Sequence, residues 1–183
     1  RHILVSEEHE EVIYIEDAIK LGGSRVKKAF VFDNSPWVFV TTKDRLYVTN
    51  IETQEEKVEY NITPDEIMSL PSHIDKVTEF FLLKTHNDFA IYNVLSGQIV
   101  FQFANHIYSN GHLVIFKQEE GIKVYDFQMG KTVIHFDGQY SFGSKFYYVK
   151  DKVLYGLNLN TSYINTIDYV KRVSEQDMLL GNH

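Results

Sequence analysis

One short pattern recurs along this chain, and the repeat limits the possible folds more than any other feature. The stretches "AIYNVLSGQIVFQF" (90–103) and "KVYDFQMGKTVIHF" (123–136) each place alternating strand-like residues on both sides of a polar turn. Weaker versions are "LYVTNIETQEEKVEY" (46–60) and "VLYGLNLNTSYINTI" (153–167). Aligned on Asn50, Asn93, Asp126 and Gly156, the units lie 43, 33 and 30 residues apart. Such a period is the mark of a repeat architecture.

A further strand precedes each of these pairs, at residues 38–42, 80–84, 113–117 and 146–150. A fifth, more divergent unit is expected at "EVIYIEDAIKLGG", with Tyr14 in the anchor region. Units of three or four short antiparallel strands at this period are typical of β-propeller blades, which must stack because one sheet cannot bury both faces alone. We therefore predict an all-β fold of four to five propeller units. A β-sandwich is the alternative.

The first interval is about ten residues longer than the second, and "TPDEIMSLP" occupies part of the surplus. Thr63 fits a helix N-cap, Pro64 the first helical position, and Glu66 the third position of a capping box. Pro71 would then end the segment. The pattern predicts a short helical insertion over residues 64–70, between two sheets.

Two of the units resemble the WD40 repeat. In that family a strand ends in Trp-Asp, a glycine follows four residues after the Asp, and Gly-His closes the next turn. Tyr125-Asp126, Gly130 and Gly138-Gln139 stand at these places in one unit, and Tyr92-Asn93, Gly97 and Asn105-His106 in the unit before it. The other two units keep only the strand–turn–strand outline, and the sole tryptophan, Trp37, lies elsewhere. The resemblance covers about residues 38–167 and implies a divergent WD40-like propeller.

Complete propellers usually carry about four to eight blades, so residues 1–183 are expected to form a single propeller domain or a fragment of a larger one. The units are anchored near residues 14, 50, 93, 126 and 156. The chain starts at Arg1 without a methionine, and "KRVSEQDMLLGNH" (171–183) is interpreted as the start of a connection. Both features favour part of a larger propeller.

The net charge and composition of the chain limit the classes of function that are expected. The net charge of −7 repels phosphate backbones and disfavours direct nucleic-acid binding. The absence of cysteine removes disulfides, thiolate nucleophiles and cysteine metal sites. No apolar run approaches the roughly 18 residues of a membrane span. We expect an intracellular protein, cytoplasmic or nuclear.

No catalytic, cofactor or metal site is expected from the motifs. The eight histidines form no H-x-H or H-x-x-x-H pair, and neither a phosphate loop nor a G-x-S-x-G elbow occurs. The segment "KTHND" (84–88) is expected to be a turn in which His86 and Asp88 can meet a ligand. The predicted partner-binding residues lie there and in the insertion: Thr63, Pro64, Asp65, Glu66, His86 and Asp88.

The resemblance and the missing catalytic motifs point to a non-catalytic protein–protein interaction scaffold, a propeller subunit of a larger complex with protein partners. The alternative is a small-molecule-binding or enzymatic propeller, quinoprotein-like or sugar-binding, with its site at the central channel. Such a site would need polar side chains from several units to converge. The sequence shows no repeated acidic or aromatic signature of that kind, and it leaves the process and the oligomeric state open.

Overall fold

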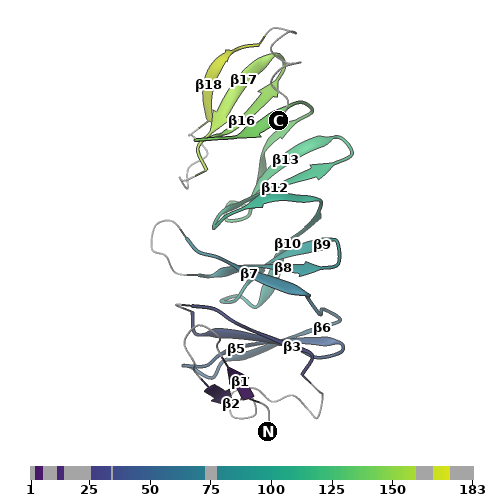
Figure 1. Cartoon of the computed structure of the whole chain (residues 1–183), viewed down its shortest axis with the longest axis vertical. Helices are drawn as coiled ribbons and strands as arrows, with labels where there is room; N and C mark the ends of the chain where they lie inside the picture. Colours follow the sequence, from purple (N-terminus) through teal and green to yellow (C-terminus); the bar gives the residue numbers. More distant parts are fainter. Residues whose placement is uncertain are drawn as a thin grey trace. The chain divides into compact units, whose positions relative to one another are not determined.

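The fold is built from four consecutive four-stranded sheets, each a meander in which strands adjacent in sequence are neighbours (Figure 1). The computed structural model describes residues 3–5, 12–14, 26–33, 35–72, 78–159 and 167–173. Within these residues all regular structure is β-strand, and every strand pairing whose register is resolved is antiparallel. Four separate four-stranded meanders favour propeller blades over the two packed sheets of a β-sandwich.

The strands of the first sheet are β3 (Lys28–Val31), β4 (Trp37–Thr41), β5 (Arg45–Asn50) and β6 (Glu56–Tyr60). Those of the second are β7 (Glu66–Leu70), β8 (Phe80–Thr85), β9 (Asp88–Asn93) and β10 (Gln98–Ala104). The third contains β11 (His106–Ser109), β12 (Leu113–Gln118), β13 (Gly121–Asp126) and β14 (Lys131–Phe136). The fourth contains β15 (Tyr140–Phe142), β16 (Phe146–Lys150), β17 (Val153–Leu157) and β18 (Ile167–Arg172).

These strands confirm the four predicted repeat units, one in each four-stranded sheet. The fifth unit lies mostly outside the described residues: Tyr14 ends β2 (Val12–Tyr14), which pairs with β1 (Ile3–Val5), and residues 15–25 are not described. Residues 174–183 of the predicted connection are likewise outside, whereas Lys171 and Arg172 belong to β18. The turn and second strand predicted for the last repeat unit lie largely within residues 160–166, outside the described residues, and β18 begins directly after them at Ile167.

The helix predicted for residues 64–70 is wrong, since Glu66–Leu70 forms strand β7. Exposure alternates over its first four residues, with Glu66 and Met68 exposed and Ile67 and Ser69 half-buried, as expected for a period of two. A seven-residue helix is marginal in isolation, whereas β7 gains a ladder with β8. Residues 61–65 connect β6 to β7, and residues 73–77, between β7 and β8, lie outside the described residues.

Three units close their third strand with the same turn. The residues at its start are Asn50, Asn93 and Asp126. The Oδ1 atom of each accepts backbone N–H groups two or three residues further on, at 2.9–3.2 Å. The residue four positions on has a positive φ and donates its N–H to the carbonyl of the first residue at 2.8 Å. These residues are Gln54 (φ 65°), Gly97 (φ 69°) and Gly130 (φ 71°).

The strand register supports this alignment and corrects the fourth anchor. In the first three sheets the first residue of the second strand pairs with the anchor residue: Trp37 with Asn50, Phe80 with Asn93, and Leu113 with Asp126. In the fourth sheet Phe146 pairs with Leu157, so the equivalent position is Leu157, one residue beyond Gly156. Within the third sheet, His106 Nε2 lies 3.0 Å from Ser109 Oγ.

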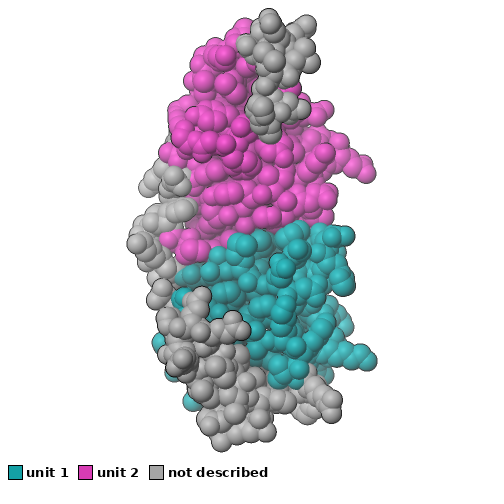
Figure 2. Space-filling view, in the orientation of Figure 1, with its two compact units in different colours: residues 1–69, 77–102 teal, residues 70–76, 103–183 magenta. Residues whose placement is uncertain are grey.

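The chain divides into two compact units (Figure 2), of which unit 1 contains residues 1–69 and 77–102, and unit 2 contains residues 70–76 and 103–183. In unit 1 the first and second sheets share an aromatic core, where the ring centroids of Phe39 and Phe81 are 4.7 Å apart. Val38 and Val40 are buried on the opposite face of β4. Burial on both faces explains why "WVFV" is continuously apolar rather than alternating.

Unit 2 has an equivalent core between the third and fourth sheets. Alternate residues of β12, β13 and β14 pack against β16 and β17, and the rings of Phe136 and Tyr148 stack with centroids 4.9 Å apart. Burial, together with the charge of Tyr155, raises the pKa of the Tyr148 phenol to about 12. Each unit thus contains a pair of sheets that bury one face against each other.

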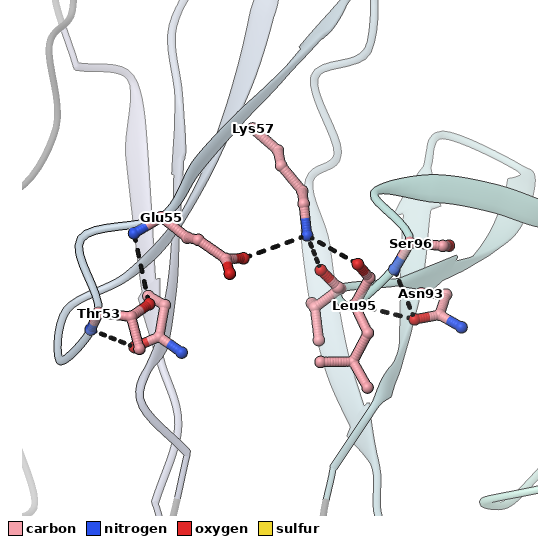
Figure 3. A network of polar contacts seen from close by, with 8 residues as sticks. Thr53, Glu55, Lys57, Asn93, Leu95 and Ser96 are labelled. Atoms are coloured by element: carbon pink, nitrogen blue, oxygen red, sulfur yellow. Dashed lines mark hydrogen bonds and ion pairs between the residues drawn. The ribbon is translucent and has the colours of Figure 1, made fainter.

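A lysine joins the two sheets of unit 1 at one end (Figure 3). Lys57, on β6, points its ammonium at the β9–β10 turn, where it donates to the carbonyl oxygens of Val94 and Leu95, the second at 3.1 Å. The same ammonium lies 3.6 Å from a carboxylate oxygen of Glu55 and 5.0 Å from the centroid of the Trp37 ring. One cation therefore satisfies turn carbonyls of the second sheet from the first.

Candidate interaction site

The connection from β6 to β7 and the turn from β8 to β9 meet at one end of unit 1. The N–H of Asp65 donates to the carbonyl of Lys84 at 2.7 Å, which fixes the start of β7 beside the end of β8. His86 and Asn87 form the two-residue turn between Thr85 and Asp88, with φ of 54° at His86. Four of the six predicted partner-binding residues, Asp65, Glu66, His86 and Asp88, therefore lie on neighbouring segments.

Asp65 is held in place by contacts from both sides. The backbone N–H of His86 donates to its Oδ2 at 3.1 Å, and the His86 Nδ1 lies 3.7 Å from the same oxygen. From β3, Lys28 Nζ donates to the Asp65 carbonyl at 2.5 Å. The His86 N–H holds the pKa of the carboxyl below its usual value; partial desolvation opposes this, and the charges of His86, Lys27 and Lys28 reinforce it.

The remaining predicted residues differ in accessibility. Glu66 is exposed and its carboxylate lies 3.8 Å from Lys84 Nζ, and Asp88 is exposed at the start of β9. The His86 side chain is 89% exposed. Thr63 is half-buried and Pro64 is buried, so Pro64 is not available to a partner. The accessible part of the site is therefore Asp65, Glu66, His86 and Asp88.

Two lysines of the site were not among the predicted residues. Lys28, on β3, donates from its ammonium to the backbone carbonyl of Asp65. Lys84 lies two residues before His86 and faces Glu66 from the neighbouring strand. Only the Lys84–Glu66 pair had a sequence signal, since opposite charges favour pairing between adjacent strands. The predicted helix hid it, because it assigned Glu66 to another element. We call Lys28, Asp65, Glu66, Lys84, His86 and Asp88 the loop cluster.

A separate hollow of about 360 Å³ lies in unit 2 beside the β12–β13 turn. Asn105 and Phe116 contribute to its wall, and Lys117, Glu119 and Glu120 contribute charged groups. Neither His86 nor Asp88 lines it. In the described parts of the chain, no group of three or more His, Asp or Glu side chains is placed to hold a metal ion. The same residues contain no helix of the length and apolar character needed to cross a membrane.

No protein-family model matches the sequence, and comparison with curated proteins gives no significant match. Several solved structures are similar. A eukaryotic initiation factor is 10% identical with a TM-score of 0.52, over 94% of this chain and 52% of that one. The C-terminal WD40 domain of Sif2 is 12% identical (TM-score 0.44, 94% and 55% covered), and BamB from Moraxella catarrhalis is 12% identical (TM-score 0.45, 92% and 59% covered).

Because the sequence identities to these solved structures are low, the similarity concerns the fold alone. The four consecutive four-stranded meanders and the repeated Asx turn, followed by a residue with positive φ, define the fold as a divergent WD40-like β-propeller. The chain spans about half the length of the solved structures it matches.

Proposed function

We propose that this protein is a non-catalytic interaction module, a scaffold subunit that binds a partner protein through the loop cluster within a larger intracellular assembly. The supporting observation is the geometry of that cluster. Charged groups of both signs stand on an exposed surface, and hydrogen bonds from His86 and Lys28 fix the Asp65 backbone and carboxylate. A fixed pattern of exposed charges supports specific recognition by a partner of complementary charge.

The domain organisation belongs to the same proposal. Residues 1–183 act as one propeller domain or as a part of a larger propeller, with units anchored near residues 14, 50, 93, 126 and 157.

A small-molecule site is the weaker alternative. It would need polar side chains from several units to converge on one pocket. The hollow in unit 2 draws its lining from the end of β10, with the adjoining Asn105, and from the β12–β13 region. His86 and Asp88 stand instead on an exposed turn of unit 1. The candidate residues thus fit contact with a protein surface better than enclosure of a ligand.

The experiment uses charge reversal at the two exposed acids that hold the least of the local structure. The tagged chain would be used for affinity capture, the retained protein identified and purified, and its binding to variants measured. Glu66→Lys with Asp88→Lys should weaken binding at least tenfold. The control, Glu52→Lys with Glu56→Lys, makes the same change of net charge at exposed positions of the first sheet and should leave binding within about twofold. Equal losses in both variants, or no retained protein, would refute the proposal.

A further inference from the structure

The outermost strand of the fourth sheet is exposed along nearly its whole length. β18 follows β17 at the end of the sheet order β15-β16-β17-β18, and five of its six residues are exposed. In the described ranges no strand pairs with its outer side. An edge of this kind presents unpaired backbone N–H and C=O groups, which an extended segment can use as a further strand.

The side chains of β18 combine exposed apolar and cationic groups. Tyr169 is 65% exposed and Val170 43% exposed, and Lys171 and Arg172 follow them directly. Lysine on a strand edge is a common protection against aggregation. Large exposed apolar side chains beside it have the opposite effect, because they increase the gain from covering the edge.

Two more cations extend this surface from the adjacent turn. Lys150 pairs with Val153, which pairs with Arg172, so Lys150 and Arg172 project from the same face on either side of a valine. Lys152 stands in the two-residue turn between β16 and β17, where Asp151 and Lys152 both have positive φ. Its carbonyl accepts the N–H of Val173 at 2.8 Å, which fixes the turn to the end of β18.

The charges around these cations are mixed but mainly positive. Lys150, Lys152 and Arg172 make no ion pair with another described residue. Asp151 lies within the same turn, and Asp168 on β18 is paired with Lys145. Asp137 contributes a further acid from the connection between β14 and β15. Two residues later in this connection, the Gln139 carbonyl accepts the N–H of Val149 at 3.0 Å, which places the connection beside β16.

We propose that β18, together with Lys150 and Lys152, is a docking edge for an extended acidic segment of a partner protein, which adds to the fourth sheet as a further strand. Backbone hydrogen bonds along β18 would hold the segment. Its carboxylates would meet Lys150, Lys152 and Arg172, and the stems of these acidic side chains would cover part of Tyr169, which lies on the same face as Lys150 and Arg172. The proposal extends the interaction role to a second surface, distinct from the loop cluster.

Charge favours an acidic peptide over a nucleic acid at this edge. The net charge of the chain is −7, so a long phosphate backbone is repelled by most of the molecule. A short peptide meets only the local field, which is positive here. Because strand side chains alternate between the two faces of a sheet, a segment of alternating apolar and acidic residues can direct all its carboxylates to the face that carries Lys150, Tyr169 and Arg172.

The binding test uses a fluorescein-labelled twelve-residue peptide that alternates Glu and Val, measured by fluorescence anisotropy with the full chain. Two control peptides separate the contributions: one replaces two central valines by proline, which removes strand donors, and one replaces every Glu by Lys. The Glu–Val peptide should bind at least about tenfold more tightly than either control. The proline peptide loses donors of the strand ladder, and the three exposed cations repel the Lys peptide. Equal binding of the proline peptide would overturn strand addition, and tighter binding of an oligo-uridine of similar length would overturn the choice of partner.

The protein variants locate the binding. Lys150→Gln, Lys152→Asn and Arg172→Gln together should weaken the peptide about tenfold. The control triple Lys43→Gln, Lys117→Gln and Lys131→Gln makes the same change of net charge at exposed positions and should change the affinity less than about twofold. Hydrogen exchange at the amides of β18 should slow when the peptide binds. Unchanged exchange, or equal losses in the two triples, would overturn the proposal.

The two proposals fail separately. The triple variant at the β18 edge leaves Glu66 and Asp88 intact, so the partner captured through the loop cluster should still bind it. If the peptide fails to bind while that partner is retained, only the edge proposal is lost.

Discussion

Replacing Lys57 by methionine should destabilise unit 1 by about 2–3 kcal/mol. Methionine keeps most of the apolar stem but removes the charge that binds the Val94 and Leu95 carbonyls. Hydrogen bonds to a charged group contribute about 1.5–3 kcal/mol each when buried. The Lys57 side chain is 23% exposed and its two hydrogen bonds share one ammonium, so together they contribute well below twice the energy of one such bond. The contact with the Trp37 ring adds about 0.5–1 kcal/mol, and the exposed Glu55 pair adds little.

Urea unfolding followed by tryptophan fluorescence measures this loss in the free energy of unfolding of unit 1. Trp37 is the only tryptophan, is 5% exposed and lies in unit 1, so its emission reports the unfolding of the first two sheets. With a denaturant slope of about 2 kcal/mol per molar, the midpoint should fall by about 1–1.5 M. Lys43→Met, at an exposed turn position, is the matched control and should stay within about 0.5 kcal/mol. A Lys57→Met variant as stable as this control would refute the role assigned to the cation.

Three further predictions concern the turns and the charged groups. Gly97→Ala should cost about 1 kcal/mol more than Gly130→Ala, because both have positive φ but only at Gly97 would a Cβ lie 2.6 Å from the Lys57 stem. Urea unfolding in a Lys57→Ala background, which removes that stem, should abolish the difference, and an unchanged difference would contradict the contact. Tyr92→Phe should leave urea stability unchanged or raise it by about 1 kcal/mol, since the buried hydroxyl has no hydrogen-bond partner among the described residues, and a loss would contradict this. The Asp65 carboxyl should titrate below its ordinary value of 3.8 in an NMR titration. A depressed pKa stabilises the fold above the unfolded value, and that contribution is lost as the pH falls through the folded value; a midpoint at or above 3.8 would contradict the contact.

The repeat was readable from sequence because its signals are local. Asn50, Asn93 and Asp126 act through their own backbone, and the residue four positions on needs a left-handed conformation that glycine adopts easily. Gln54 fills that position in one unit despite its side chain. The four anchored strands followed from alternation, which the pleat of a strand imposes directly.

The missed features depend on contacts between distant segments. The capping pattern from Thr63 to Glu66 is a genuine local signal for a helix, but pairing with β8 outweighs it and makes Glu66–Leu70 a strand. The bond from Lys28 to Asp65 joins residues 37 positions apart, and so does the bond from Lys57 to Val94. Neither leaves a trace in the local pattern. The candidate acids and His86 were found because they lie on turns, where exposed charges stand out.

Co-purification of the protein at its native level through graded salt washes tests the central claim most directly. An interaction module should retain a stoichiometric partner at low salt, and the contacts made by the exposed charges of the loop cluster should weaken as rising salt screens them. A protein that emerges alone and monomeric from the first wash would contradict the account.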